Sequence, residues 1–496
     1  MAYKVLKGVA IVVGIIAATL FAVRAFDAYR AAPLSRWHTF KPHELNAKEI
    51  DSSDWARYLA AENTAFEEVR REVTSKLDQR ERVLANRYFD GSPIYPPRLS
   101  TDWNRSYVMM PDGAASGAVV LLHGLTDSPY SMRHIARRYR DEGFVALAIR
   151  LPGHGTVPAG LTSVDWEDWS AATRLAVREA RRRAGEGQPL HIVGYSNGGA
   201  LALKYALDAL TDPTLPRPHR LILISPMIGV TAFARFAGFF GLPAFFPAFA
   251  NAAWLSVDPE FNPFKYNSFP INGARQSSLL TRALQAQIGD LARRGQLDTL
   301  APVLTFQSVV DFTVSARAVV TSLYGNLPAN GSELVLFDVN RSSRFGALLR
   351  PSADTLLSQV LPQPPRNYRT AIIANADSGD EVEERVMEPG ATREQLRPLG
   401  LKYPAEVYSL SHVALPFPID DALYGLHPDM RDDYGVNLGA MALRGERGTL
   451  IVSPDSLMRM SSNPFFPYML SRIDEGIVGR GHSVAKAPAD PAAPEP

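Results

Sequence analysis

The chain has 496 residues, of which 46% are hydrophobic, and this length suggests one large elaborated domain or two modest ones. Its net charge of +1 excludes the strongly basic surface typical of nucleic-acid-binding proteins, and the sequence has no acidic tail. Cysteine is absent, which excludes disulfides, thiolate metal sites and a cysteine nucleophile but leaves the cellular compartment open.

An apolar run near the N-terminus is the first predicted element. It covers Gly8–Phe26, 19 residues, and a helix needs about 20 residues to cross a bilayer. A cleaved signal peptide is the alternative, but Val23-Arg24-Ala25 is a poor cleavage site because an arginine separates the small residues. We therefore predict an uncleaved single-pass anchor within residues 1–29. With the N-terminus inside a bacterial inner membrane, the rest of the chain would lie in the periplasm.

A linker and a long amphipathic helix are predicted within residues 30–98. Apolar residues recur every three to four positions up to about Arg87, and Asp51, Ser52 and Ser53 offer N-caps. The polar face mixes acidic and basic side chains, which disfavours a helix lying on a membrane surface. We expect this helix to pack on the domain that follows.

From residue 99 to residue 485, predicted strands alternate with predicted helices. Continuous runs of Val, Ile and Leu separated by helices are typical of a parallel sheet that is covered on both faces. We therefore expect an α/β fold with a mostly parallel, eight-stranded sheet and helices on both faces. Ligands bind at the carboxyl ends of the strands in such sheets. The predicted strands are 106–110, 118–123, 144–150, 190–193, 220–225, 303–309, 333–339 and 406–410.

A G-x-S-x-G pattern, Gly194-Tyr195-Ser196-Asn197-Gly198, follows the fourth of these strands and precedes a helix-forming run. In this context the turn is so tight that the serine is strained and its Oγ is lifted clear of the sheet. Glycine is needed on both sides because a Cβ there would collide with the neighbouring strand or helix. The start of the helix directs the Asn197 amide toward the same point, where it can stabilise an oxyanion.

Two further motifs precede this serine: Leu-Leu-His-Gly-Leu-Thr-Asp-Ser-Pro at 121–129 and Arg-Leu-Pro-Gly-His-Gly at 150–155. In this order, the three motifs resemble the α/β-hydrolase fold. The resemblance is closest to lipase-like carboxylesterases, monoacylglycerol lipases, lysophospholipases and serine aminopeptidase-like hydrolases, and it covers residues 100–311. It implies an oxyanion hole formed by the backbone amides of Leu125 and Asn197.

Three histidines then have structural roles in our interpretation. The resemblance makes His123 and His154 loop residues rather than bases, and His191 lies inside a predicted strand.

Ser196 needs a base and an acid that orients the base, and the expected order along the chain is serine, acid, histidine. Asp311 follows the strand 303–309 and is the predicted acid, with Asp338 as the alternative. In the family, the histidine follows the last strand soon after the acid, but this sequence has none there. His412 is the next histidine, and it is the predicted base.

The alternatives to His412 are His427 and His482, which lie further from any predicted strand end. With His412 as the base, residues 341–403 are interpreted as an insertion. A second insertion at about 226–298 corresponds to the cap of the family and is rich in aromatic residues, which would cover the serine and bind an acyl chain. Some of these rings must instead form the core of the cap. The tail 486–496 is rich in Ala and Pro and is predicted to be disordered.

Together these features predict a membrane-anchored serine hydrolase, with its catalytic domain in the periplasm, that cleaves carboxylic esters through an acyl-enzyme. The resemblance suggests lipid-like substrates and implies no metal and no organic cofactor. No nucleic-acid partner is expected, and the oligomeric state stays open. The alternatives are acyl transfer or peptide cleavage by the same triad, and a non-catalytic binding protein on a hydrolase fold.

Overall fold

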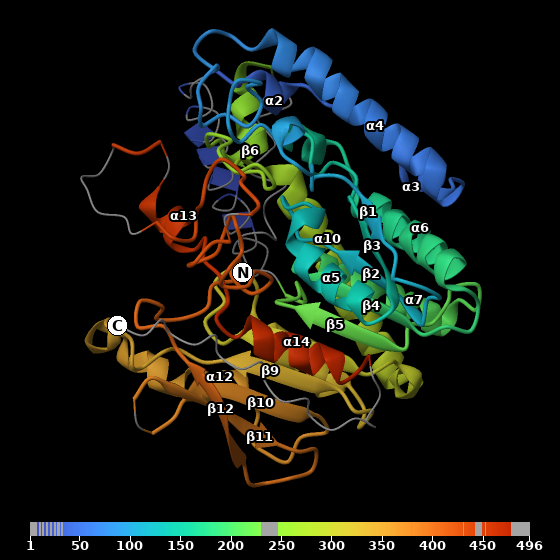
Figure 1. The fold of residues 1–496 in the computed structure, drawn as a ribbon, viewed down its shortest axis with the longest axis vertical. Helices are drawn as coiled ribbons and strands as arrows, with labels where there is room; N and C mark the ends of the chain where they lie inside the picture. The colour runs from blue at the N-terminus through green and yellow to red at the C-terminus, as the bar shows by residue number, and fades with distance from the viewer. Residues whose placement is uncertain are drawn as a thin grey trace, which may run out of the picture.

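The computed structural model of the chain describes residues 33–229, 247–377, 379–429, 431–441, 449–451 and 453–477, together with scattered positions between Lys7 and Arg30. Figure 1 shows the ribbon, with the N-terminal helices at one end of the molecule and the last strands at the other.

Among the residues that the structure describes, a ten-stranded sheet forms the centre, in the order β1-β3-β2-β4-β5-β8-β9-β10-β11-β12. All neighbouring pairs from β3 to β10 are parallel, whereas β1, β11 and β12 are antiparallel to their neighbours. The mostly parallel α/β sheet is therefore confirmed, but it has ten strands rather than eight. The strands are β1 Tyr107–Met109, β2 Gly117–Leu122, β3 Phe144–Ile149, β4 Leu190–Tyr195, β5 Arg220–Ile224, β8 Val303–Ser308, β9 Glu333–Phe337, β10 Arg369–Asn375, β11 Glu381–Met387 and β12 Gln395–Lys402.

Helices cover both faces of this sheet, and each face has its own hydrophobic core. Successive side chains of a strand point to opposite faces, so Val119 and Leu121 of β2 pack in one core while Val120 and Leu122 pack in the other. The first core includes α5 (Arg133–Asp141) and α14 (Phe466–Asp474). The second includes α6 (Trp166–Ala184), α7 (Asn197–Thr211) and α10 (Ile271–Arg293).

An N-terminal layer contains the helices α2 (Arg36–Thr39), α3 (Ala47–Asp51) and α4 (Trp55–Glu72) (Figure 1). Helices α3 and α4 pack on this second core, whereas Trp37 of α2 packs in a separate, smaller cluster. The Tyr58 hydroxyl donates to the Arg150 carbonyl at 2.6 Å, and the buried Arg150 guanidinium pairs with Glu62 at 3.1 Å. The layer is thereby fixed to the loop that follows β3.

Helix α4 is shorter than the sequence predicts. It begins after Asp54, whose side chain accepts from the Arg57 amide at 2.8 Å, and it ends at Glu72 rather than near Arg87. Of the apolar residues that recur beyond Glu72, Val73 and Leu77 are buried, but Leu84 is 66% exposed, so the buried face does not continue to Arg87. Arg87, predicted near the end of the helix, is buried in an irregular segment and donates to Asn104 Oδ1 at 3.1 Å.

The predicted N-terminal membrane anchor is contradicted. A helix must offer about 20 consecutive apolar residues to cross a bilayer core. The structure contains no such helix among the residues that it describes. Part of Gly8–Phe26 lies outside those residues. The predicted single-pass anchor, the membrane contact through it and the periplasmic location at an inner membrane are therefore wrong.

The segment 341–403, interpreted as an insertion, contributes three strands to the central sheet. β10 runs parallel to β9, and β11 and β12 extend the sheet beyond it. The segment 406–410, predicted as the last strand, forms none. Two of its carbonyls accept hydrogen bonds from Asn340 rather than from a neighbouring strand. The Asn340 amide donates to the Tyr408 carbonyl at 2.8 Å, and Asn340 Nδ2 donates to the Val407 carbonyl at 2.8 Å.

The region predicted as a cap includes β6 (Trp254–Ser256), β7 (Phe269–Pro270) and the long helix α10. The tail 486–496 and part of the predicted aromatic cap fall outside the described residues, including Phe233, Phe236, Phe239, Phe240, Phe245 and Phe246. Shorter helices elsewhere are α11 Ala316–Ala318, α12 Leu356–Val360 and α13 Pro454–Met458.

Candidate active site

Ser196 occupies a strained turn between β4 and α7. Its φ of 56° and ψ of −116° are unusual for a residue with a side chain. Two backbone hydrogen bonds hold this conformation: the Ser196 amide donates to the Ile224 carbonyl at 2.9 Å, and the Ser196 carbonyl accepts from the Met227 amide at 2.9 Å. The strand, the tight turn and the helix thus have the arrangement expected from the sequence motif.

The glycines around Ser196 permit this close packing. A Cβ on Gly194 would lie 2.2 Å from the Gly198 carbonyl oxygen, and a Cβ on Gly198 would lie 2.1 Å from the Leu122 carbonyl oxygen. Both distances are far inside van der Waals contact, and the atoms approached belong to the backbone. Glycine at these positions therefore brings the start of α7 against the carboxyl end of β2.

The loop after β2 lies directly beside Ser196. A Cβ built on Gly124 would be 3.2 Å from the Ser196 Cβ. The next residue, Leu125, has an amide that makes no hydrogen bond within the described part of the chain. Asn197 is the first residue of α7, and the first amides of a helix lack an acceptor in that helix. The two predicted oxyanion donors are therefore near the serine and available to a ligand.

His123 connects this loop to the one after β3. The Leu151 amide donates to His123 Nε2 at 3.0 Å, so the proton of the neutral ring must be on Nδ1, which donates to the Gly124 carbonyl at 2.9 Å. Burial, together with the neighbouring His154, holds the pKa of His123 well below its usual value. Because the Gly124 carbonyl and the Leu125 amide belong to one peptide plane, this bond also orients the candidate oxyanion donor.

Asp311 and His412 are paired. His412 Nδ1 donates to Asp311 Oδ2 at 2.8 Å, although the two residues are 101 positions apart in the sequence. Both side chains are almost fully buried: that of His412 is 5% exposed and that of Asp311 is 0% exposed. The amides of Thr313 and Val314 donate to Asp311 Oδ1 at 2.8 and 3.0 Å, so the carboxylate is fixed from both sides.

The surroundings of Asp311 keep it ionised. Burial by itself would raise the pKa of Asp311, but the His412 charge, the His412 hydrogen bond and the two loop amides outweigh it and lower the pKa. Because His412 donates through Nδ1, its Nε2 is the unprotonated nitrogen of the neutral ring and can accept a proton. The Tyr195 hydroxyl donates to the His412 carbonyl at 3.3 Å and helps to fix this loop.

The alternative acid and bases have other surroundings. Asp338 is as buried as Asp311, but its Oδ2 pairs with the Arg341 guanidinium at 2.6 Å. His427 is exposed and lies outside the group that lines the cavity described below. His482 falls outside the described residues. Of these residues, the structure brings Asp311 and His412 together.

One cavity, with a volume of about 570 Å³, contains Ser196, His412 and Leu125 in its wall. Its lining also has charged residues that the sequence motifs did not single out, namely Lys265, Asp258, Asp455 and Arg459. Lys265 could have been noticed because it is the lone charge among the aromatic residues of 261–269. The apolar part of the wall consists of Leu125, Met227, Phe261, Phe269, Phe312, Val413 and Met460.

No cluster of three or more metal-ligating side chains occurs in the part of the chain that the structure describes. The wall itself offers a hydroxyl, an imidazole paired with a carboxylate, and two available backbone amides.

Comparison with known families agrees with this geometry. Residues 113–340 match the family model described as Serine aminopeptidase, S33. Over these residues the chain is similar to α/β-hydrolases of the lipase- and esterase-like kind.

Among curated proteins, the chain is similar to a thermostable monoacylglycerol lipase from a Bacillus species, with 34% identity over 88 residues. The match covers 18% of this chain and 34% of the relative, so the chain spans about a third of the length of that protein. Among solved structures, it is similar to a monoglyceride lipase of Saccharomyces cerevisiae (16% identity, 47% of this chain, 81% of that one, TM-score 0.35). A monoacylglycerol lipase of Paleococcus ferrophilus is also similar (16% identity, 51% and 98%, TM-score 0.36).

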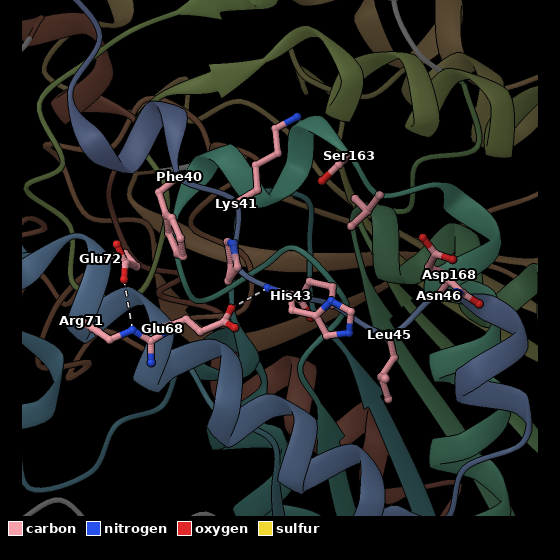
Figure 2. A pocket seen from close by; sticks show the side chains of 13 residues that line it. Phe40, Lys41, His43, Leu45, Asn46, Glu68, Arg71, Glu72, Ser163 and Asp168 are labelled. Carbon is pink, nitrogen blue, oxygen red and sulfur yellow. Dashed lines mark hydrogen bonds and ion pairs between the residues drawn. The ribbon is translucent and has the colours of Figure 1, made fainter.

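A second cavity of the hydrolase, of about 510 Å³, lies beside the N-terminal layer (Figure 2). Two of its acidic side chains already have backbone partners: Glu68 accepts from the His43 amide at 2.8 Å, and Asp168 accepts from the Ala47 amide at 2.7 Å. None of the candidate catalytic residues contributes to it. It therefore has no evident part in the chemistry of Ser196.

Proposed function

We propose that this hydrolase cleaves carboxylic esters through an acyl-enzyme formed on Ser196. The observation that carries the proposal is the buried pair of Asp311 and His412, which reaches the same cavity as the strained serine. Serine is a poor nucleophile at neutral pH, and a histidine oriented by a carboxylate is the usual means of activating it.

In the proposed mechanism, His412 Nε2 takes the Ser196 proton as Oγ attacks the ester carbonyl. The positive charge that develops on the ring is stabilised by Asp311, which accepts from Nδ1 at 2.8 Å. The amides of Leu125 and Asn197 hold the oxyanion, a contribution worth about 10²–10³ in rate for each donor in comparable enzymes. His412 then returns the proton to the leaving alcohol, and water releases the acyl group by the same steps.

The substrate that we propose is an ester with a substantial apolar part. Seven apolar side chains line the cavity that contains Ser196, and burial of apolar substrate surface stabilises binding by about 25 cal/mol per Å². The similarity to a monoacylglycerol lipase over 88 residues is compatible with such a substrate.

A fluorophosphonate probe tests this proposal because it labels only an activated serine. We expect labelling of the wild type and hydrolysis of 4-nitrophenyl butyrate, and loss of both in Ser196→Ala with an unchanged circular dichroism spectrum. His412→Ala should also lose labelling, whereas its matched control His427→Ala, at an exposed position, should keep it. A folded wild type that neither reacts with the probe nor hydrolyses the ester would contradict the proposal and favour a binding protein.

A further inference from the structure

Lys265 brings a cation into the cavity of Ser196 on a fixed piece of backbone. The next residue, Tyr266, donates from its amide to the Thr126 carbonyl at 2.7 Å and from its hydroxyl to the Gly153 carbonyl at 3.1 Å. Thr126 directly follows Leu125 in the oxyanion loop. The segment that carries Lys265 is therefore hydrogen-bonded to the loop that carries the candidate oxyanion donor.

The residue on the other side of Lys265 is anchored as well. The ring of Phe264 stacks on Tyr130, with centroids 4.2 Å apart and planes at 13°. The Phe264 amide donates to Asn262 Oδ1 at 3.0 Å. Phe264 and Tyr266 are both buried, so their rings hold in place the backbone from which the Lys265 side chain extends.

Lys265 forms no ion pair and no side-chain hydrogen bond with any residue that the structure describes. Burial lowers the pKa of its ammonium, while the nearby Asp127 carboxylate acts in the opposite direction. Asp127 is itself buried, and burial raises the pKa of its carboxyl to about 6. The other charged residues of the cavity wall, Asp258, Asp455 and Arg459, are exposed. A partly desolvated cation without a close partner favours a bound anion.

We propose that Lys265 binds an anionic group of the substrate, a carboxylate or a phosphate, and so makes the enzyme selective for amphipathic esters that carry a negative charge. This inference rests on the proposed ester hydrolysis at Ser196. The apolar residues of the same wall would contact the hydrocarbon part, and Lys265 would contact the charged end. A hydrogen bond to a charged group of the substrate should give a preference of about ten- to hundredfold for the charged ester.

The test compares esters of equal length with and without the charge. The mono-4-nitrophenyl ester of glutaric acid, which has a free carboxylate, is paired with 4-nitrophenyl valerate. A 1-acylglycerol 3-phosphate is paired with the 1-monoacylglycerol of the same chain. Whichever pair shows the larger effect identifies the preferred anion. We expect Lys265→Met to lower kcat/KM about ten- to hundredfold for the charged member of at least one pair and less than threefold for its neutral partner.

Lys265→Arg, which keeps the charge, should retain most of the preference. The matched control Lys402→Met removes a lysine from the exposed end of β12 and should change neither substrate. Equal losses on the charged and neutral esters, or no loss on either, would overturn the role of Lys265 while leaving ester hydrolysis intact. Failure of the wild type to hydrolyse all four esters, without fluorophosphonate labelling, would instead overturn the proposed function.

Discussion

The two sides of the candidate site are built differently. The elbow side, Ser196 with the Leu125 loop, is held by backbone contacts within residues 117–229, such as the contact of Gly198 with the Leu122 carbonyl. The base side, Asp311 with His412, joins residues 101 positions apart. Local sequence therefore determines the elbow side almost completely, whereas the base side depends on how the chain returns to the sheet after a long excursion.

The return takes place at Asn340, which follows β9 by three residues and is fully buried. Its side-chain amide donates to the carbonyls of Pro404 and Val407 at 3.1 and 2.8 Å. The chain thus leaves the sheet near Asn340, forms β10, β11 and β12, and comes back against Asn340 before it reaches His412. In space, His412 enters the site from the end of β9, although it lies 75 positions after Phe337, the last residue of that strand.

The sharpest way to break the base side is to neutralise its carboxylate. We expect Asp311→Asn to lower kcat by about 10⁴, because the amide can no longer favour the Nδ1-protonated ring or stabilise its positive charge. Asp338→Asn is the matched control, since Asp338 is equally buried at the end of the next strand but pairs with Arg341 at 2.6 Å. It should keep kcat within about threefold and lower only stability. The reverse pattern, measured by steady-state kinetics, would assign the acid to Asp338.

The sequence predicted the elbow side well because short-range sterics act there. The strands next to it are continuous runs of Val, Ile and Leu, and β2, β3, β4 and β5 lie within two residues of their predicted bounds. The tight turn leaves few choices besides glycine at Gly194 and Gly198. Asp311 and His412 were predicted from their order along the chain, which gives no evidence about their separation in space.

The errors have physical causes that a single sequence does not reveal. The segment 406–410 has the apolar content of a strand, but its carbonyls are taken by Asn340. β11 was missed because Glu383, Glu384 and Arg385 hide its apolar alternation, and a tertiary contact compensates one of these charges: Glu384 accepts from the Tyr468 hydroxyl at 2.8 Å. Lys265 stood out in no motif, because its importance depends on the cavity that it faces.

A smaller effect should follow from loosening the return of the chain. Asn340→Ala leaves the carbonyls of Pro404 and Val407 without their donor, at a cost of about 1–3 kcal/mol for each buried group. We expect kcat to fall about tenfold with little change in KM, because the His412 loop loses its support while the cavity wall keeps its shape. Asn330→Ala is the control. The Asn330 side chain donates to the Leu300 carbonyl at 3.0 Å just before β9 begins, at the opposite end of that strand from Asn340. An equal loss of kcat in both variants would mean that general destabilisation is the cause.

The smallest expected effect concerns the pH dependence of stability on the elbow side. His123 is neutral in the folded protein, since burial holds its pKa well below 6.5, whereas the unfolded chain binds a proton there near pH 6.5. The unfolded state therefore binds more protons below this pH, and the free energy of unfolding must decrease as the pH falls. His123→Gln should reduce the difference in bound protons between the unfolded and folded states by up to one. The free energy of unfolding should then change less steeply with pH between pH 4.5 and 6.5, by up to about 1.4 kcal/mol per pH unit. Urea unfolding at several pH values measures it.

His191 is a control for His123, because it is also a buried histidine with a lowered pKa but forms its hydrogen bond with Tyr139 rather than with the oxyanion loop. It lies in β4 with its Nδ1 3.0 Å from the Tyr139 hydroxyl, and burial, with Arg220 and His219, lowers its pKa to about 3. His191→Gln should therefore flatten the acid slope about as much as His123→Gln does. Only His123→Gln should also slow turnover, because His123, unlike His191, donates to the Gly124 carbonyl and so helps the Asp127 amide, at 3.3 Å, to orient the Leu125 peptide. Equal turnover in the two variants at pH 7 would mean that the oxyanion loop keeps its geometry without this bond, and that the glycine contacts around Ser196 suffice to hold the elbow side.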